Sequence, residues 1–337
     1  MKRQRLVDYL KALFIVWVII THSGVMNEKS TLYLLSVVQA VPSFMVLSGY
    51  TFALTAENKS VYQMYDAKNL LRKFLRFTIP TLVTYIIYLV GWSVAGKDQL
   101  GTGDVIYRFV MGLYGPGGYY YGMMVQFLVL APILFLLIRK YDTKGIILVG
   151  GTTFLFELFC SIIHIDENIY RVLIFRYLLF LAMGMYLYIH KNDTVRKSVL
   201  VMFMMIGVAY LLIPSCCEYQ RKLFTRWSDT SMMTIFYLYP ILYVIFHKFG
   251  TIQMRGWIGT VLEVIGQSSY HIMYVQLIYY VGVKDVLYQI FKLGLLGNLM
   301  EVMVAIIISV VGGIIFYYAD NKIFGHLYKK RNVERLE

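Results

Sequence analysis

The chain has 337 residues, of which 59% are hydrophobic and only 15% are charged. Soluble domains average about 45–50% apolar and about 25% charged residues, so this composition excludes an ordinary soluble protein and indicates a chain that crosses a membrane several times. The mean hydropathy of +0.63 points the same way. The net charge of +13 would suit nucleic-acid binding, but the cations form short clusters between apolar runs, which is typical of membrane orientation signals.

Ten apolar segments reach the length of about 20 residues that a transmembrane helix needs. They cover residues 6–25, 31–55, 75–95, 119–138, 145–163, 170–189, 198–214, 231–247, 257–282 and 299–319. The first follows a basic N-terminus, but it is too long for a signal peptide and no small-x-small cleavage site follows it, so we expect it to be retained. The segment 101–115 is shorter and charged, which predicts an interfacial or re-entrant helix. We therefore expect an all-α, polytopic membrane protein of about ten transmembrane helices, with one domain over residues 1–337.

Lysine and arginine collect on one side of the predicted spans. With the N-terminus inside, the cytoplasmic segments carry more than twice as many of these cations as the outer segments. The cytoplasmic clusters lie in residues 2–5, 59–76, 139–144, 191–197, 248–255 and 322–335. The basic loop 215–231 is a local exception on the outside. Because cytoplasmic loops are enriched in Lys and Arg, the pattern predicts that both termini are cytoplasmic.

The first apolar segment carries three ionisable residues, Asp8, Lys11 and His22. Lys11 and His22 are eleven residues apart, about 1100° of helical rotation, so both face one side and lie about 16 Å apart along the axis. Asp8 precedes Lys11 by three residues and can pair with it. Ionisable groups in lipid usually mark function, and a buried histidine suits general-base chemistry. The alternative is a snorkelling Lys11 and a His22 that only bonds a neighbouring helix.

The second apolar segment contains "VPSFMVLSGYTFAL", residues 41–54. Pro42 is expected to kink this span, because proline cannot donate a helical hydrogen bond. Ser48 and Gly49 permit a close approach of another backbone. Taken alone, these residues are explained better by ordinary helix packing than by a functional role.

Four cations lie where the third span begins: Lys68, Arg72, Lys73 and Arg76. Lys68, Arg72 and Arg76 are spaced by four residues, so we expect them to form one stripe along the helix. Such a stripe is typical of cytoplasmic anchoring. It also suits a clamp for the phosphates of a cytoplasmic anionic ligand.

Together these stretches resemble the acyltransferase-3 family of integral-membrane O-acyltransferases. The family's Asp, Arg and His of the first span are matched by Asp8, Lys11 and His22. Its second-span motif is matched by Pro42, Ser43, Phe44, Leu47, Ser48, Gly49 and Tyr50, and its Arg-x-x-Arg with a following proline by Lys73, Arg76 and Pro80. Residues 119–134, "YYYGMMVQFLVLAPIL", and 265–276, "IGQSSYHIMYVQ", are similar to later family motifs. The resemblance covers essentially the whole chain in order.

The sequence departs from the family pattern at four places. Lys11 and Lys73 replace arginines, which keeps the charge but turns a bidentate group into a point charge. The stretch "YYYG" lacks the usual tryptophan. Gln276 stands where many members carry histidine, so we assign no catalytic role to that position.

The resemblance implies transfer of an acyl group, usually acetyl, from cytoplasmic acyl-CoA to a hydroxyl of a cell-envelope or exported polysaccharide. His22 would act as a general base or a transient acyl carrier, while Lys11 would contact CoA or support Asp8. The implied donor-binding residues are Arg72, Lys73 and Arg76 for the CoA phosphates and Ser48, Gly49 and Tyr50 for the channel wall. Acetyl-CoA is thus the expected donor, with no metal and no nucleic acid, in a bacterial plasma membrane. The acceptor glycan and the oligomeric state, a homo-oligomer included, stay open.

Two other function classes compete with this interpretation. A secondary transporter or a flippase of lipid-linked sugars would explain the charged spans, but it predicts inverted-repeat symmetry, which the sequence does not show. A non-catalytic scaffold would leave Lys11 and His22 unexplained. Glu157 and Arg176, on neighbouring spans, are predicted to form a structural ion pair or, alternatively, part of an acceptor site. The cysteines, Cys160, Cys216 and Cys217, lack the spacing of metal ligands.

Overall fold

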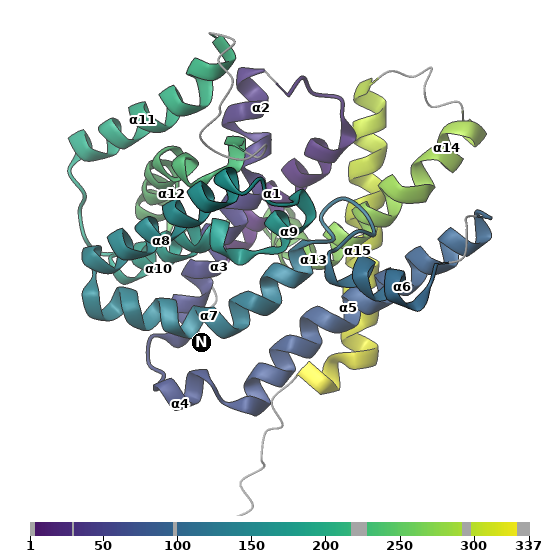
Figure 1. Ribbon diagram of the computed structural model, residues 1–337, viewed down its shortest axis with the longest axis horizontal. Helices are drawn as coiled ribbons and strands as arrows, with labels where there is room; N and C mark the ends of the chain where they lie inside the picture. Colours follow the sequence, from purple (N-terminus) through teal and green to yellow (C-terminus); the bar gives the residue numbers. More distant parts are fainter. Residues whose placement is uncertain (1–3, 29, 97–99, 217–227, 292–297, 329–337) are drawn as a thin grey trace, which may run out of the picture.

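The computed structural model describes residues 4–28, 30–96, 100–216, 228–291 and 298–328, and within these residues every regular element is a helix (Figure 1). The α-helices are α1 (Arg5–Ser23), α2 (Thr31–Leu35), α3 (Ala40–Ala56), α4 (Val61–Met64), α5 (Ala67–Val94), α6 (Thr102–Val110), α7 (Tyr120–Tyr141), α8 (Thr143–Ile162), α9 (Glu167–Val172), α10 (Leu178–Ile189), α11 (Lys197–Cys216), α12 (Ile235–Phe249), α13 (Trp257–Ile278), α14 (Lys284–Phe291) and α15 (Asn298–Tyr328). Short 3₁₀ segments occupy Val37–Gln39, Ile174–Tyr177, Ser228–Thr230 and Met232–Thr234. The π-helical segment Tyr279–Val283 joins α13 to α14. The prediction of an all-α protein is therefore confirmed.

The predicted spans coincide with helices. Among the described residues, seven helical stretches are long and apolar enough to cross a membrane: Arg5–Ser23, Thr31–Ala56, Val61–Val94, Tyr120–Tyr141, Thr143–Ile162, Met232–Phe249 and Leu299–Tyr328. The shorter apolar helices Ile174–Ile189 and Lys197–Ile213, together with α13, cover the other three predicted spans. The chain is thus a multi-pass membrane protein. The number ten and the cytoplasmic placement of both termini stay predictions, and most of the basic loop 215–231, Cys217 included, lies outside the described residues.

The second span is interrupted, but not at Pro42 as the sequence predicts. The α-helix α2 ends at Leu35, the 3₁₀ segment Val37–Gln39 follows, and α3 begins at Ala40. Pro42 therefore lies in the first turn of α3, where an amide donor has no helical partner and proline is tolerated. The irregularity falls just before it, where Gln39 donates its side-chain amide to the carbonyls of Leu34 and Asp229.

Helix α1 lies between two packed groups of helices (Figure 1). Its first half contributes Leu6, Leu10 and Phe14 to a core built with α3, α7, α10 and α12. Its second half contributes Val18 and Ile19 to a core built with α5, α13 and α15. Because α1 belongs to both cores, its polar residues are held at the junction of the two groups.

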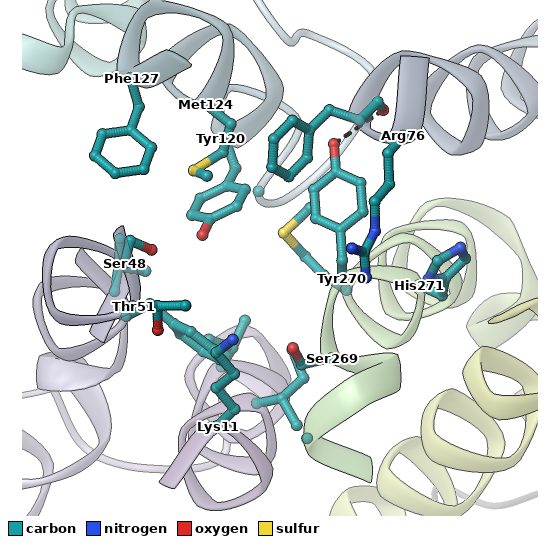
Figure 2. Close-up of a pocket in the computed structure, with 18 of the residues that line it drawn as sticks. Lys11, Ser48, Thr51, Arg76, Tyr120, Met124, Phe127, Ser269, Tyr270 and His271 are labelled. Atoms are coloured by element: carbon teal, nitrogen blue, oxygen red, sulfur yellow. Dashed lines mark hydrogen bonds between the residues drawn. The ribbon is translucent and has the colours of Figure 1, made fainter. Parts of the chain in front are cut away.

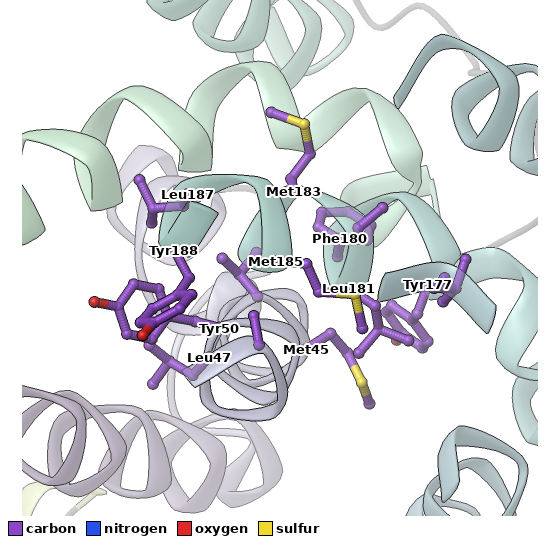
Figure 3. Packing of buried hydrophobic residues seen from close by; sticks show 14 of the residues in the cluster. Met45, Leu47, Tyr50, Tyr177, Phe180, Leu181, Met183, Met185, Leu187 and Tyr188 are labelled. Atoms are coloured by element: carbon purple, nitrogen blue, oxygen red, sulfur yellow. The ribbon is translucent and has the colours of Figure 1, made fainter. Parts of the chain in front are cut away.

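Glycines allow α3 and α10 to pack backbone against backbone (Figure 3). A β-carbon at Gly49 would overlap the carbonyl of Leu181 on α10, and one at Gly184 would overlap the carbonyl of Val46 on α3. Because lipid tails are as apolar as the side chains, the hydrophobic effect contributes little to helix association in a membrane. Close van der Waals packing at small residues is therefore a main contribution. This contact fixes one face of α3 against α10 and leaves the opposite face for the site described below.

The C-terminal ends of α3 and α10 are also joined by polar contacts. Tyr188 donates its hydroxyl to Glu57 Oε2 at 2.5 Å, and Lys191 Nζ lies 3.3 Å from Glu57 Oε1. The hydrogen bond from Tyr188, followed by the Lys191 ammonium, lowers the pKa of the Glu57 carboxyl. The carboxylate is thus favoured at this helix end.

The segment 101–115 contains a short helix, α6, followed by a glycine-rich turn. Gly112, Gly115 and Gly117 all have positive φ angles, of 65°, 142° and 91°, which glycine adopts without steric cost. The turn is buried against the bundle: Tyr114 is fully buried and donates its hydroxyl to the carbonyl of Gly118 at 3.1 Å. A β-carbon at Gly115 would lie 2.7 Å from the side chain of Leu277 on α13. This segment therefore forms part of the wall next to α13.

Candidate active site

A cavity of about 370 Å³ lies between α1, α3, α5, α7 and α13, with the glycine-rich turn at one side (Figure 2). Six of the predicted site residues line it: Asp8, Lys11, His22, Ser48, Lys73 and Arg76. These residues come from three helices that are separate in the sequence. Their convergence on one cavity makes this the candidate active site.

Helix α1 contributes one wall of the cavity. Lys11, Ile15, Val18 and His22 follow one another at spacings of three or four residues and all line it. This is the shared face that the helical spacing predicts. Lys11 extends into the cavity between Thr51 on α3 and Ser269 on α13 (Figure 2).

Asp8 lies one turn before Lys11 and is 4% exposed. The backbone next to it is in tight contact with α13, since a β-carbon at Gly266 would overlap the Asp8 carbonyl. A glycine at this position therefore lets α1 and α13 meet beside the cavity.

His22 lies at the other end of this wall, half-buried, and contacts a polar residue of α13. Its Nδ1 is 2.9 Å from Nε2 of Gln276, which is fully buried. The Tyr280 hydroxyl donates to the carbonyl of Ile19 at 2.9 Å, so α13 and the segment after it are attached to the last turns of α1. Gln276, to which the sequence assigns no catalytic role, is thus in direct contact with the predicted base.

The predicted cationic stripe on α5 is only partly directed into the cavity. Lys73 and Arg76 line it, and Lys73 Nζ lies 5.6 Å from the centre of the Phe52 ring. Arg72 does not line it and instead donates from Nη1 to Asn69 Oδ1 at 3.2 Å. Adjacent helical residues are rotated by about 100°, so Arg72 and Lys73 face different directions, while Lys73 and Arg76, three residues apart, share a face.

The three residues predicted to line the channel from α3 also separate. Ser48 lines the cavity together with Thr51, but Gly49 faces α10. The Tyr50 ring stacks on Phe246 of α12, with 4.2 Å between ring centroids. Three consecutive helical residues span about 200° of rotation and cannot all face one cavity. Of the predicted channel residues, the structure therefore places only Ser48 at the site.

Among the other polar residues of the cavity are Tyr120, Tyr270 and His271, to which the sequence interpretation assigned no individual role (Figure 2). Tyr270 donates its hydroxyl to the carbonyl of Phe77 on α5 at 3.1 Å, and His271 Nε2 lies 3.1 Å from Asp320 Oδ2 on α15. A histidine in the middle of the apolar segment 257–282 was the signal that could have identified His271. Both tyrosines lie in stretches similar to family motifs, but nothing distinguishes them from the other tyrosines in a chain with 30 of them.

Glu157 and Arg176 lie outside the cavity, in a separate buried cluster. Glu157 Oε2 accepts a hydrogen bond of 2.7 Å from the Tyr170 hydroxyl. The Arg176 guanidinium lies 4.6 Å from the ring centres of both Tyr170 and Tyr177, and its Nη2 donates to Thr230 Oγ1 at 2.7 Å. Both charged residues are fully buried. The cluster therefore joins α8, α9 and the segments before α10 and α12.

The described part of the chain contains no cluster of metal-ligating side chains. There, no three residues among His, Cys, Asp and Glu come together in a way that could hold a metal ion. The polar groups of the cavity are cations, hydroxyls, two histidines, one carboxylate and one amide, that of Gln267. Such a set can bind an anionic ligand and move a proton.

Comparison with known proteins identifies the kind of enzyme. No curated protein and no solved structure matches the chain. The acyltransferase-3 family model, which describes an acyltransferase domain, matches residues 5–318, nearly the whole chain. Members of this family are acyltransferases, which decides between the enzyme and the alternative of a transporter or flippase. The chain therefore belongs to the acyltransferase-3 family and is an integral-membrane O-acyltransferase.

Proposed function

We propose that this enzyme transfers an acyl group, acetyl in the simplest case, from cytoplasmic acyl-CoA to a hydroxyl of a cell-envelope or exported glycan. Both termini and the 56–74 loop face the cytoplasm of a bacterial cell, and ten helices cross its plasma membrane. The observation that carries this proposal is the cavity itself, because it joins two cations on α5 to a histidine on α1.

The donor fits the cavity by charge and by length. Lys73 and Arg76 supply positive charge for the CoA phosphates, which cationic side chains bind through charge-assisted hydrogen bonds. Between Lys11 and His22, α1 rises by about 16 Å, comparable to an extended phosphopantetheine arm. The walls along this path are largely apolar, with Phe44, Phe52 and Phe77 among the lining residues, which suits the uncharged arm.

His22 takes the role of general base on the acceptor. Its imidazole removes the proton from the glycan hydroxyl as the hydroxyl oxygen attacks the thioester carbonyl carbon. A carbon–oxygen bond forms, the carbon–sulfur bond breaks, and the electron pair leaves with the CoA sulfur, which takes up a proton. The products are an O-acyl ester and CoA thiol. Direct attack is the simpler route, because it needs His22 only as a base, whereas an acyl-enzyme would need a protein group to carry the acyl group first.

Neutral donors in the cavity support this chemistry. The hydroxyl of Tyr120 points toward the centre of the cavity, on the side where Ser48 lies (Figure 2). Donors held near a reacting carbonyl stabilise the negative charge that develops on its oxygen. Lys11, also directed into the cavity, adds a positive charge along the donor path.

The test combines a purified enzyme with a chemical readout of the product. Mass spectrometry of envelope glycans from cells with and without the gene identifies the acceptor by the loss of an acyl group. The same acceptor and radiolabelled acetyl-CoA are then given to purified enzyme in lipid nanodiscs. Labelled glycan supports the proposal, while identical glycans in both cells and no transfer from any acyl-CoA refute it.

A further inference from the structure

We infer that Gln276 is a positioning residue that accepts a hydrogen bond from Nδ1–H of His22 and so leaves Nε2 free as the base. This inference deepens the proposed function and rests on it. The amide of Gln276 and Nδ1 of His22 are 2.9 Å apart, and Gln276 is fully buried. The contact joins α13 directly to the predicted base on α1.

A neutral imidazole has one protonated nitrogen and one nitrogen with a free lone pair, so the contact at Nδ1 determines what Nε2 can do. If the amino end of Gln276 donated to Nδ1, the proton of the ring would be on Nε2. Neither nitrogen could then accept the proton of an acceptor hydroxyl. A base role for His22 therefore requires the carbonyl end of Gln276 to face Nδ1.

The contact itself permits this orientation. Which atom donates and which accepts between His22 and Gln276 depends on the tautomer of the ring. The two ends of an amide have nearly the same shape, and their orientation is decided by the partners. The far end of the Gln276 amide has no hydrogen-bond partner among the described residues, which leaves Nδ1 to decide it.

The contact also gains strength as the reaction proceeds. When Nε2 takes the proton of the acceptor hydroxyl, the ring becomes a cation and Nδ1–H donates to Gln276 as a charged group. Hydrogen bonds to charged groups are worth about twice those between neutral groups. Gln276 therefore stabilises the transition state more than the ground state, which raises kcat rather than lowering KM.

Substitutions at Gln276 distinguish its role as a hydrogen-bond acceptor from its contribution to packing. Gln276→Leu keeps a similar volume but neither donates nor accepts. Gln276→Glu, when ionised, can only accept, so it keeps the proton on Nδ1. Ser268→Ala is the matched control, because Ser268 is buried on the same helix and does not line the cavity.

The test reads the tautomer and the kinetics of the full-length enzyme in lipid nanodiscs. Protonated and unprotonated ring nitrogens have well-separated ¹⁵N frequencies, and comparison with His22→Asn identifies the signals of His22 among the six histidines. We expect neutral His22 to carry its proton on Nδ1 in the wild type, in Gln276→Glu and in Ser268→Ala. In Gln276→Leu this preference is lost, and kcat falls by about 10-fold or more with KM for acyl-CoA unchanged. Gln276→Glu restores most of that loss.

Two results overturn the inference. One is a wild-type His22 protonated on Nε2. The other is a Gln276→Leu enzyme with the wild-type spectrum and the wild-type kcat. Full activity of His22→Ala would refute the base assignment and the inference with it. An inactive His22→Ala beside an unaffected Gln276→Leu would refute the inference alone and leave the proposed function standing.

Discussion

Removal of one cation on α5 is expected to weaken donor binding, while removal of its neighbour is not. Arg76 lines the cavity, whereas Arg72 is turned away and bonds to Asn69. A hydrogen bond to a charged group contributes roughly 1.5–3 kcal/mol, and 1.4 kcal/mol corresponds to a tenfold change in affinity. Arg76 is exposed to solvent, which screens its charge, so the lower end of this range applies. We expect Arg76→Ala to raise the Kd for acyl-CoA about tenfold and Arg72→Ala to leave it nearly unchanged.

The assay is calorimetric titration of CoA into the purified wild type and both variants. Added salt should weaken CoA binding to the wild type more than to Arg76→Ala, because a charge contact is screened by ions. A pantetheine fragment without phosphates should bind all three proteins alike. If Arg72→Ala and Arg76→Ala weaken CoA binding equally, or neither does, the donor phosphates bind elsewhere. If Arg76→Ala only lowers membrane yield, with unchanged affinity in the inserted protein, Arg76 is an orientation signal.

Two other predictions concern packing and topology. Gly184→Ala should lower the Tm, because the added β-carbon would overlap a carbonyl of α3, and overpacking typically costs about 1–3 kcal/mol. Gly91→Ala is the control and should leave the Tm unchanged, since nothing lies within 4 Å of its added carbon. Equal Tm values for the two variants would contradict the close contact between α3 and α10. In a protein whose native cysteines are replaced by serine, a membrane-impermeant thiol reagent added outside intact cells should label Glu28→Cys but not Lys59→Cys. The reverse pattern would invert the orientation and the mechanism with it.

The sequence predicted the helices well because hydropathy reports directly on the bilayer. Backbone groups in lipid must be satisfied within the chain, so each long apolar run has few alternatives to a helix. The position of Pro42 was less predictable, since proline is tolerated in a first turn and the sequence does not mark where α3 begins. The break at Val37–Gln39 depends on a contact of Gln39 with Asp229, 190 residues away, which no local pattern contains.

The candidate site was predictable along each helix but not between helices. Spacing alone placed Lys11 and His22 on one face of α1. Which of Arg72 and Lys73 faces the cavity depends on how α5 is rotated against its neighbours, and this rotation is a property of packing. The direction of Tyr50 likewise depends on packing, because its ring stacks on Phe246 of α12. The contact between Gln276 and His22 joins residues 254 positions apart, so only the fold could show it.

Acyl transfer by the His22→Ala enzyme is the measurement that tests the central claim most directly. Purified wild type and His22→Ala, inserted in nanodiscs at equal amounts and shown to have the same Tm, are given radiolabelled acetyl-CoA and the acceptor glycan. Loss of a general base typically costs about 10²–10⁴-fold in rate, so we expect the variant to transfer far less than a tenth of the wild-type label. Transfer above a tenth of the wild-type rate by the intact variant would contradict the assignment of His22 as the base.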